Sequence, residues 1–286
     1  MTPRRGIVIG GALFIAIAVG GALLTVSPAV PAQTILPLPV VNNVTVLTYT
    51  LIGERRISRT ASDFTYRVNV RNTGPALIVV SGTVSSTSTA VTFPDSAVSF
   101  GDIASGTPAT STDTFRIRQN RTQRFSRNQL VWQFRAAPGE GIPPDPGPAN
   151  DLTIAGIDSD SDGVRDDVER WIAYSQPSSA RRRAALIQFA TGFGNALTSS
   201  TSRVDAVATS RSLGNALACL QASAAGQDPD VWYYGAKEIE AQYFNTRERW
   251  RVYREYNALL GGNSGASIPF DQRAAACVVD PTSLPN

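Results

Sequence analysis

The sequence predicts two domains of different class, an antiparallel β-sandwich followed by an all-α domain. Short runs rich in β-branched and aromatic residues, separated by turn residues, fill residues 44–137. The prolines of residues 138–150 predict a semi-rigid linker. Beyond this linker, apolar residues recur at the spacing that is typical of α-helices. An acidic twelve-residue loop stands near the start of this second domain, residues 151–286.

The N-terminus carries the features of an export signal. Arg4 and Arg5 precede an uncharged apolar stretch, Gly6–Val26, and small residues and prolines continue to Ala32. The stretch fits either a signal peptide cleaved after Ala32 or a retained single-pass membrane anchor. Residues 1–32 therefore predict export to the periplasm, the cell surface or the medium, and a Pro-rich spacer, residues 33–43, follows.

Alternating or continuous runs of β-forming residues predict six or seven short strands in the sandwich. The clearest are Val44–Ile52, Phe64–Val70, Ala76–Val80, Thr114–Ile117 and Leu130–Phe134. Turn residues separate the runs at 72–75, 93–95, 101–102 and 106–108.

Three segments of this region resemble the immunoglobulin-like (Ig-like) modules of bacterial surface proteins. They are Asn72-Thr-Gly-Pro75 after a strand, Val98-Ser-Phe-Gly-Asp-Ile103 and Ser111-Thr-Asp-Thr-Phe-Arg-Ile117. The resemblance implies an Ig-like sandwich that serves as a spacer or an adhesive unit. Such a fold does not by itself define a function.

Helical periodicity with identifiable boundary residues predicts the elements of the second domain. Pro177 ends the first helix, Asn245 or Thr246 caps the fifth, and Gly261 and Gly262 end it. The predicted helices are Asp166–Ser175, Ser179–Leu197, Arg203–Ser223, Pro229–Phe244, Thr246–Leu260 and a short one at Asp271–Val278.

The segment Asp158–Glu169 matches the EF-hand calcium loop at each diagnostic position, with Gly163 at the sharp turn. The predicted ligands are Asp158, Asp160, Asp162, the carbonyl oxygen of Val164, Asp166 directly or through water, and a bidentate Glu169. This many hard oxygen donors at this spacing fits Ca²⁺, because Mg²⁺ demands a tighter octahedron. The alternative is a solvated acidic turn without an ion.

Two features distinguish this loop from a sensor EF-hand. No helix is predicted before it, and Arg165 stands at position 8, which is usually aliphatic where two loops pair. The loop resembles the bacterial thrombospondin type 3 repeat, a short Asp-rich calcium loop of exported proteins. We therefore expect one unpaired, structural calcium ion that nucleates the helical domain by fixing the turn from which its first helix begins.

Cys219 and Cys277 are the only two cysteines of the chain. In an oxidising compartment, two cysteines in one helical domain predict a disulfide, and their Cα atoms should then lie within about 7 Å. Free buried thiols are the alternative.

Aromatic residues concentrate in the fourth and fifth predicted helices. Trp250, Tyr253 and Leu260 share one face at helical spacing, so we expect them in the core. A sugar-binding role would instead require Trp232 or Trp250 to be exposed. A carboxylate-based hydrolase would require acids such as Glu238, Glu240, Glu248 and Asp271 to converge, which their spacing does not demand.

The composition argues against the common enzyme classes. The chain has no histidine, and Lys237, its only lysine, lies in no phosphate-binding motif. The nearly balanced charge beyond the N-terminal segment argues against nucleic acid as a partner. The part from the calcium loop to Cys277 is similar to a group of exported bacterial proteins of unassigned function, which implies no activity.

These observations together predict a non-enzymatic, calcium-binding structural or interaction protein of the cell envelope. Its expected partners are the calcium ion and an envelope glycan or another envelope protein, with membrane contact only through the N-terminal segment. The alternative function is a carboxylate-based glycan-acting hydrolase or a sugar-binding module.

Overall fold

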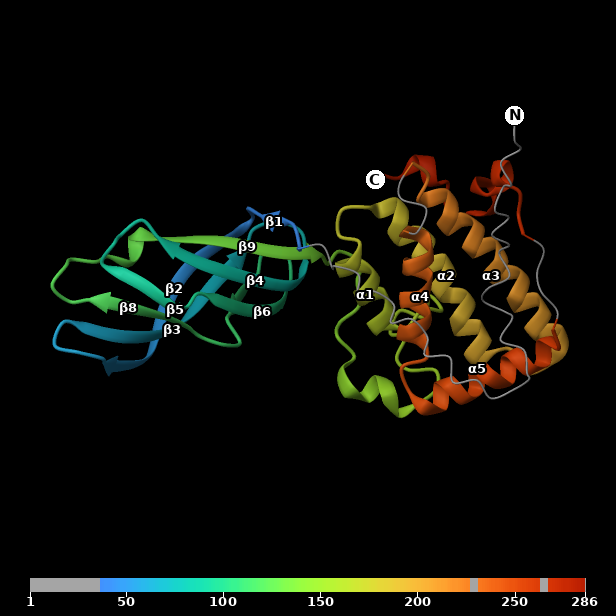
Figure 1. The fold of residues 1–286 in the computed structure, drawn as a ribbon, viewed down its shortest axis with the longest axis horizontal. Coiled ribbons are helices and arrows are strands. Elements are labelled where there is room, and N and C mark those ends of the chain that lie inside the picture. Colours follow the sequence, from blue (N-terminus) through green and yellow to red (C-terminus); the bar gives the residue numbers. More distant parts are fainter. Residues whose placement is uncertain (1–36, 227–230, 263–266, 286) are drawn as a thin grey trace, which may run out of the picture. The chain divides into compact units, whose positions relative to one another are not determined.

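The computed structural model describes residues 37–226, 231–262 and 267–285, which divide into two compact units (Figure 1). The first comprises residues 37–142 and Ala173–Pro177, and the second comprises residues 143–172 and 178–285. We call them the β unit and the helical unit. The predicted export segment lies outside the described residues, and no described helix is long and apolar enough to cross a membrane.

Two antiparallel sheets form the β unit, as the strand pattern predicts (Figure 1). The first sheet has the order β1 (Val40–Val41), β9 (Leu130–Pro138), β4 (Leu77–Ser86) and β6 (Ala97–Ile103). The second has the order β2 (Val44–Arg56), β3 (Ala61–Asn72), β8 (Phe115–Asn120) and β5 (Val91–Asp95), and β7 (Pro108–Thr110) also pairs with β3.

Both sheets contribute to one hydrophobic core. Val68 and Phe115 of the second sheet are buried in it together with Val80 and Phe134 of the first. Trp132 stacks on Phe134 with a centroid distance of 5.7 Å, and its Nε1 donates a hydrogen bond of 2.9 Å to the hydroxyl of Tyr49. Alternation along the strands thus places one face of each sheet in a shared interior.

The strands are longer and more numerous than the sequence predicts, with nine among the described residues. Two predicted turns, at 93–95 and 101–102, lie inside β5 and β6 instead. Pro94 is tolerated because β5 is the last strand of its sheet, where a missing N–H breaks no ladder. Gly101 has φ +71° at an irregularity in the β4–β6 register, so this glycine forms a bulge rather than a turn.

Five α-helices form at the predicted places in the helical unit, except that the last three residues of the first helix, Ala173–Ser175, are counted with the β unit. They are α1 (Asp166–Ser175), α2 (Ala180–Thr198), α3 (Arg203–Ser223), α4 (Val231–Tyr243) and α5 (Arg247–Leu260). Thr246 caps α5, and Gly261 ends it in the left-handed conformation with φ +56°. The predicted start of the fourth helix, at 229–230, lies outside the described residues.

The predicted sixth helix is wrong in type. Phe270–Gln272 and Ala274–Ala276 form two short 3₁₀ turns, and Cys277 is already extended. Cys277 is bonded to Cys219 of α3, with 4.8 Å between their Cα atoms, so the structure contains the predicted disulfide. The bond holds the C-terminal segment on α3, and this constraint competes with a regular helix at 271–278.

The core of the helical unit surrounds α2, which packs against α3, α4 and α5 (Figure 1). The Phe193 ring of α2 contacts the rings of Tyr243, Phe244 and Tyr253. Tyr253 and Leu260 are buried as predicted. Trp250, which the sequence also predicts to lie in the core, is 46% exposed. Its neighbour Arg249 is fully buried instead.

Candidate metal site

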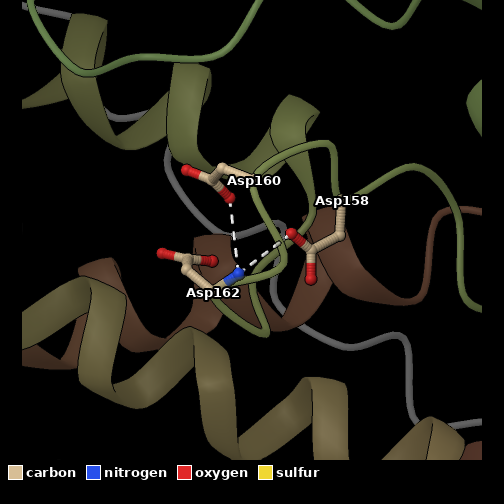
Figure 2. Close-up of side chains that lie close together, drawn as sticks. All are labelled: Asp158, Asp160 and Asp162. Atoms are coloured by element: carbon tan, nitrogen blue, oxygen red, sulfur yellow. Dashed lines mark hydrogen bonds between the residues drawn. The ribbon is translucent and has the colours of Figure 1, made fainter.

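Three predicted ligands form a compact carboxylate cluster between η2 (Gly147–Leu152) and α1 (Figure 2). One carboxylate oxygen from each of Asp158, Asp160 and Asp162 lies within 4.8 Å of the other two. Two oxygens bound to one Ca²⁺ at its usual ligand distances are at most about 5 Å apart. The spacing of these three side chains therefore fits a shared calcium ion.

Backbone amides shape the loop around these carboxylates. The amide of Asp162 donates to Oδ1 of Asp158 and to Oδ1 of Asp160, at 3.2 and 3.4 Å (Figure 2). The amide of Gly163 donates to the other oxygen of Asp158 at 3.0 Å. Gly163 has φ +90°, a conformation that favours glycine, as the predicted sharp turn requires.

Asp166 closes the loop from its C-terminal end. Its Oδ1 accepts a hydrogen bond of 2.8 Å from the amide of Ser159, and its own amide donates to the carbonyl oxygen of Ile157 at 2.9 Å. Asp166 is also the first residue of α1, where a negative charge interacts favourably with the helix dipole. Val164 is fully buried, and its amide donates a hydrogen bond to the carboxylate of Asp162. The role of its carbonyl oxygen as a calcium ligand stays a prediction.

Glu169 is the predicted ligand with the most unusual environment. Only 6% of its surface is exposed, and its buried Oε2 has no hydrogen-bond partner among the described residues. Burial is the larger cause, and the negative charges of the four loop aspartates, Asp162 foremost, are the smaller one; together they raise the pKa of Glu169 to about 8. A buried carboxylate oxygen without a partner is rare in a folded protein, and here the charges of the loop aspartates also act on the group.

Arg165, at position 8 of the loop, anchors the loop to the end of α4. Its side chain is 4% exposed and makes two hydrogen bonds to the carboxylate of Asp167, at 2.9 and 2.7 Å. It also donates to the carbonyl oxygens of Gln242 and Tyr243, at 2.9 and 3.1 Å. An arginine here thus satisfies terminal carbonyls of a helix, where an aliphatic residue would pair with a second loop.

Arg249 of α5 fixes the chain that enters the loop. Its guanidinium donates to the carbonyl oxygens of Asn150, Thr153 and Ile154 and to the carboxylate of Asp151. These contacts explain why Arg249 is buried while Trp250 is exposed. The two arginines therefore hold the segment that enters the loop and the second half of the loop itself.

Gly194 of α2 lets the helix approach the loop closely. A Cβ atom at this position would lie 2.8 Å from the carbonyl oxygen of Gly163, which is closer than van der Waals contact allows. Because the obstructing atom belongs to the backbone, it cannot move aside as a flexible side chain would. The sequence signal was a pair of glycines inside a predicted helix, at 192 and 194, which often marks close packing.

We expect Gly194→Ala to destabilise the helical unit by about 1–3 kcal/mol, because the methyl group overpacks the loop. Alanine normally favours a helix over glycine, so the expected sign is the reverse of the usual one. Gly214→Ala in α3 is the matched control, since no atom lies within 4 Å of its Cβ position. Urea unfolding should show a stabilised Gly214→Ala variant, and an equally stabilised Gly194→Ala variant would contradict the close approach.

Comparison of the chain with protein-family models, with curated proteins and with solved structures gives no match.

Proposed function

We propose that this protein is an exported structural or interaction protein whose helical unit is stabilised by one calcium ion in the loop Asp158–Glu169. The observations that carry the proposal are the cluster of Asp158, Asp160 and Asp162 and the buried, unpartnered Oε2 of Glu169, whose pKa the charges of these aspartates raise. A divalent cation would supply the missing partner and offset the repulsion among the carboxylates. The export part of the proposal rests on the N-terminal sequence.

The donor set favours calcium over other metals. The carboxylates are hard oxygen ligands, and the chain has no histidine to add a nitrogen ligand. Calcium also tolerates the irregular geometry of a loop better than Mg²⁺, which needs a near-ideal octahedron.

The contacts around the loop favour a structural role over a signalling role. The loop leads directly into α1; Arg165 connects the loop itself to the end of α4, and Arg249 connects the segment before the loop to α5. An ion at this place would fix a loop that these two arginines connect to segments distant in sequence. A sensor EF-hand works differently, because calcium opens a pair of helices there.

We expect saturating calcium to stabilise the helical unit by about 1.4–2.7 kcal/mol, which corresponds to a calcium concentration 10–100 times the Kd. The melting temperature of this unit should rise by several degrees in calorimetry of the whole protein, relative to excess chelator. The same concentration of magnesium should give a smaller rise. Identical melting curves with calcium and with chelator would contradict the structural role.

The Glu169→Gln variant tests whether Glu169 is a calcium ligand or an ordinary core residue. In chelator it should be no less stable than the unmodified protein, because the change replaces a buried carboxyl group whose Oε2 has no partner by a neutral amide of nearly the same shape. In calcium it should be the less stable of the two, because the ligand is lost. Glu248→Gln, on an exposed face of α5, should follow the unmodified protein in both conditions. A variant that is equally destabilised with and without calcium would show a packing role only.

The exposed Trp250 is the observation that favours the sugar-binding alternative. Its ring lies against those of Phe244 and Tyr253, at centroid distances of 6.1 and 5.7 Å. It therefore has neighbours within its own unit that account for its position, and calcium binding remains the proposal with the stronger support.

A further inference from the structure

We propose that one end of the β unit binds the surface of an anionic phospholipid bilayer. This end consists of residues 54–63, around the turn between β2 and β3, and residues 118–127, at the end of β8 and in the loop after it. We call it the arginine end. The proposal concerns a surface separate from the calcium loop and from the N-terminal segment.

The two segments lie side by side in the β unit. Ala61 pairs with Asn120 in the β3–β8 ladder, and the amide of Arg121 donates to the carbonyl oxygen of Thr60 at 2.7 Å. Figure 1 shows the β2–β3 turn and the loop after β8 at the same end of the two sheets.

The net charge of the β unit is concentrated at this end. The arginine end holds seven arginines against two acidic residues, whereas the rest of residues 37–142 holds four of each. The seven are Arg55, Arg56, Arg59, Arg118, Arg121, Arg124 and Arg127. An uneven distribution of this kind creates a local positive potential that the near-neutral total charge of the protein conceals.

Only part of this charge is neutralised within the protein. The buried Asp63 accepts two hydrogen bonds from Arg118, at 2.7 and 3.0 Å, and lies 3.4 Å from Arg55. The remaining five arginines are exposed and make no ion pair within the described residues: Arg56, Arg59, Arg121, Arg124 and Arg127. Guanidinium groups recognise phosphate oxygens through paired hydrogen bonds, so phosphate-bearing partners fit this surface.

Exposed apolar side chains favour a membrane over a soluble polyanion. Ile57, in the β2–β3 turn among the arginines, is 39% exposed, and Leu51 and Ile52 further along β2 are about half exposed, at 51% and 54%. Basic groups that surround exposed aliphatic side chains are typical of surfaces that rest in the headgroup region of a bilayer. A soluble polyanion would use the arginines and gain nothing from Ile57.

The test is vesicle sedimentation of the whole protein with phosphatidylcholine vesicles, with and without phosphatidylglycerol. The readout is the ratio of the two affinities, compared between the unmodified protein and charge-reversal variants, because Arg4 and Arg5 of the N-terminal segment also favour anionic vesicles but are the same in all of these proteins. We expect anionic vesicles to bind at least about tenfold more tightly, since each basic residue near such a surface contributes about fivefold. High salt should abolish the preference.

Charge-reversal variants locate the surface. The pair Arg59→Glu and Arg121→Glu should lower the affinity for anionic vesicles roughly a hundredfold. The pair Arg67→Glu and Arg71→Glu makes the same charge change on exposed positions of β3 away from the arginine end, and should have a much smaller effect. Equal losses for the two pairs, or no preference for anionic vesicles, would overturn the proposal.

Ile57→Ser distinguishes the lipid surface from a soluble polyanion. This variant should bind anionic vesicles severalfold more weakly and bind soluble polyphosphate unchanged. If Ile57→Ser has no effect on vesicle binding and polyphosphate competes fully, the surface recognises soluble polyanions and the bilayer proposal fails.

Discussion

Replacing Arg165 by methionine is expected to destabilise the helical unit by about 3–5 kcal/mol, the usual loss when one partner of a buried ionic network is removed. Methionine preserves most of the length of the side chain but donates no hydrogen bond. Asp167 would lose its bidentate partner, the carbonyl oxygen of Tyr243 would lose a buried hydrogen bond, and that of Gln242 would lose a partly buried one. Urea unfolding monitored by circular dichroism at the helical band measures this change.

Arg251→Met is the matched control for this prediction. Arg251 also contacts two carboxylates, those of Glu248 and Glu255, but all three side chains are more than half exposed. Ion pairs of this kind contribute little to stability, so the control should unfold close to the unmodified protein. If Arg165→Met were no more destabilised than Arg251→Met, the contact between the loop and α4 would have no anchoring role.

The double variant Cys219→Ser and Cys277→Ser should lose about 4 kcal/mol, the chain-entropy value for a loop closed over 58 residues. The melting temperature of the helical unit should then fall by about 15 °C. The C-terminal segment should also lose its fixed position on α2, where Gln188 donates to the carbonyl oxygen of Ala276 and accepts from the amide of Val278, both at 2.9 Å.

The reductant response provides the control for the disulfide prediction. Reductant should lower the melting temperature of the unmodified protein to that of the double variant and should leave the variant unchanged. Gln188→Ala removes the hydrogen bonds but keeps the disulfide, so it should lose only about 1–2 kcal/mol. A double variant as stable as the unmodified protein would show that the bond does not support the helical unit.

The elements of the fold could be predicted where local residues decide them. Thr246 and Gly261 define the ends of α5 through their own side-chain and backbone preferences, and both ends lie where these residues indicate. The predicted turns at Pro94 and Gly101 are wrong, because proline and glycine between strands usually indicate a turn. Their actual roles, in an edge strand and a bulge, depend on which strands are neighbours, and the local sequence does not contain that information.

The candidate site shows the same division between local and distant causes. The spacing of Asp158, Asp160 and Asp162 is a local property, and the structure brings these carboxylates together. The burial of Arg249 results from contacts with residues more than ninety positions away in sequence. Helical periodicity therefore favoured its neighbour Trp250 as the core residue, and it could not reveal that α5 turns an arginine toward the loop.

Equilibrium dialysis of the whole protein against radioactive calcium measures whether the loop Asp158–Glu169 binds the ion. We expect one calcium ion per chain, with a Kd of about 10⁻⁴–10⁻³ M, the range of extracellular calcium modules. Binding should be lost in Asp158→Ala and in Glu169→Gln and retained in Asp271→Asn, a change at an exposed acid outside the loop. The absence of bound calcium, or binding that persists in both loop variants, would contradict the assignment of this loop as a calcium site.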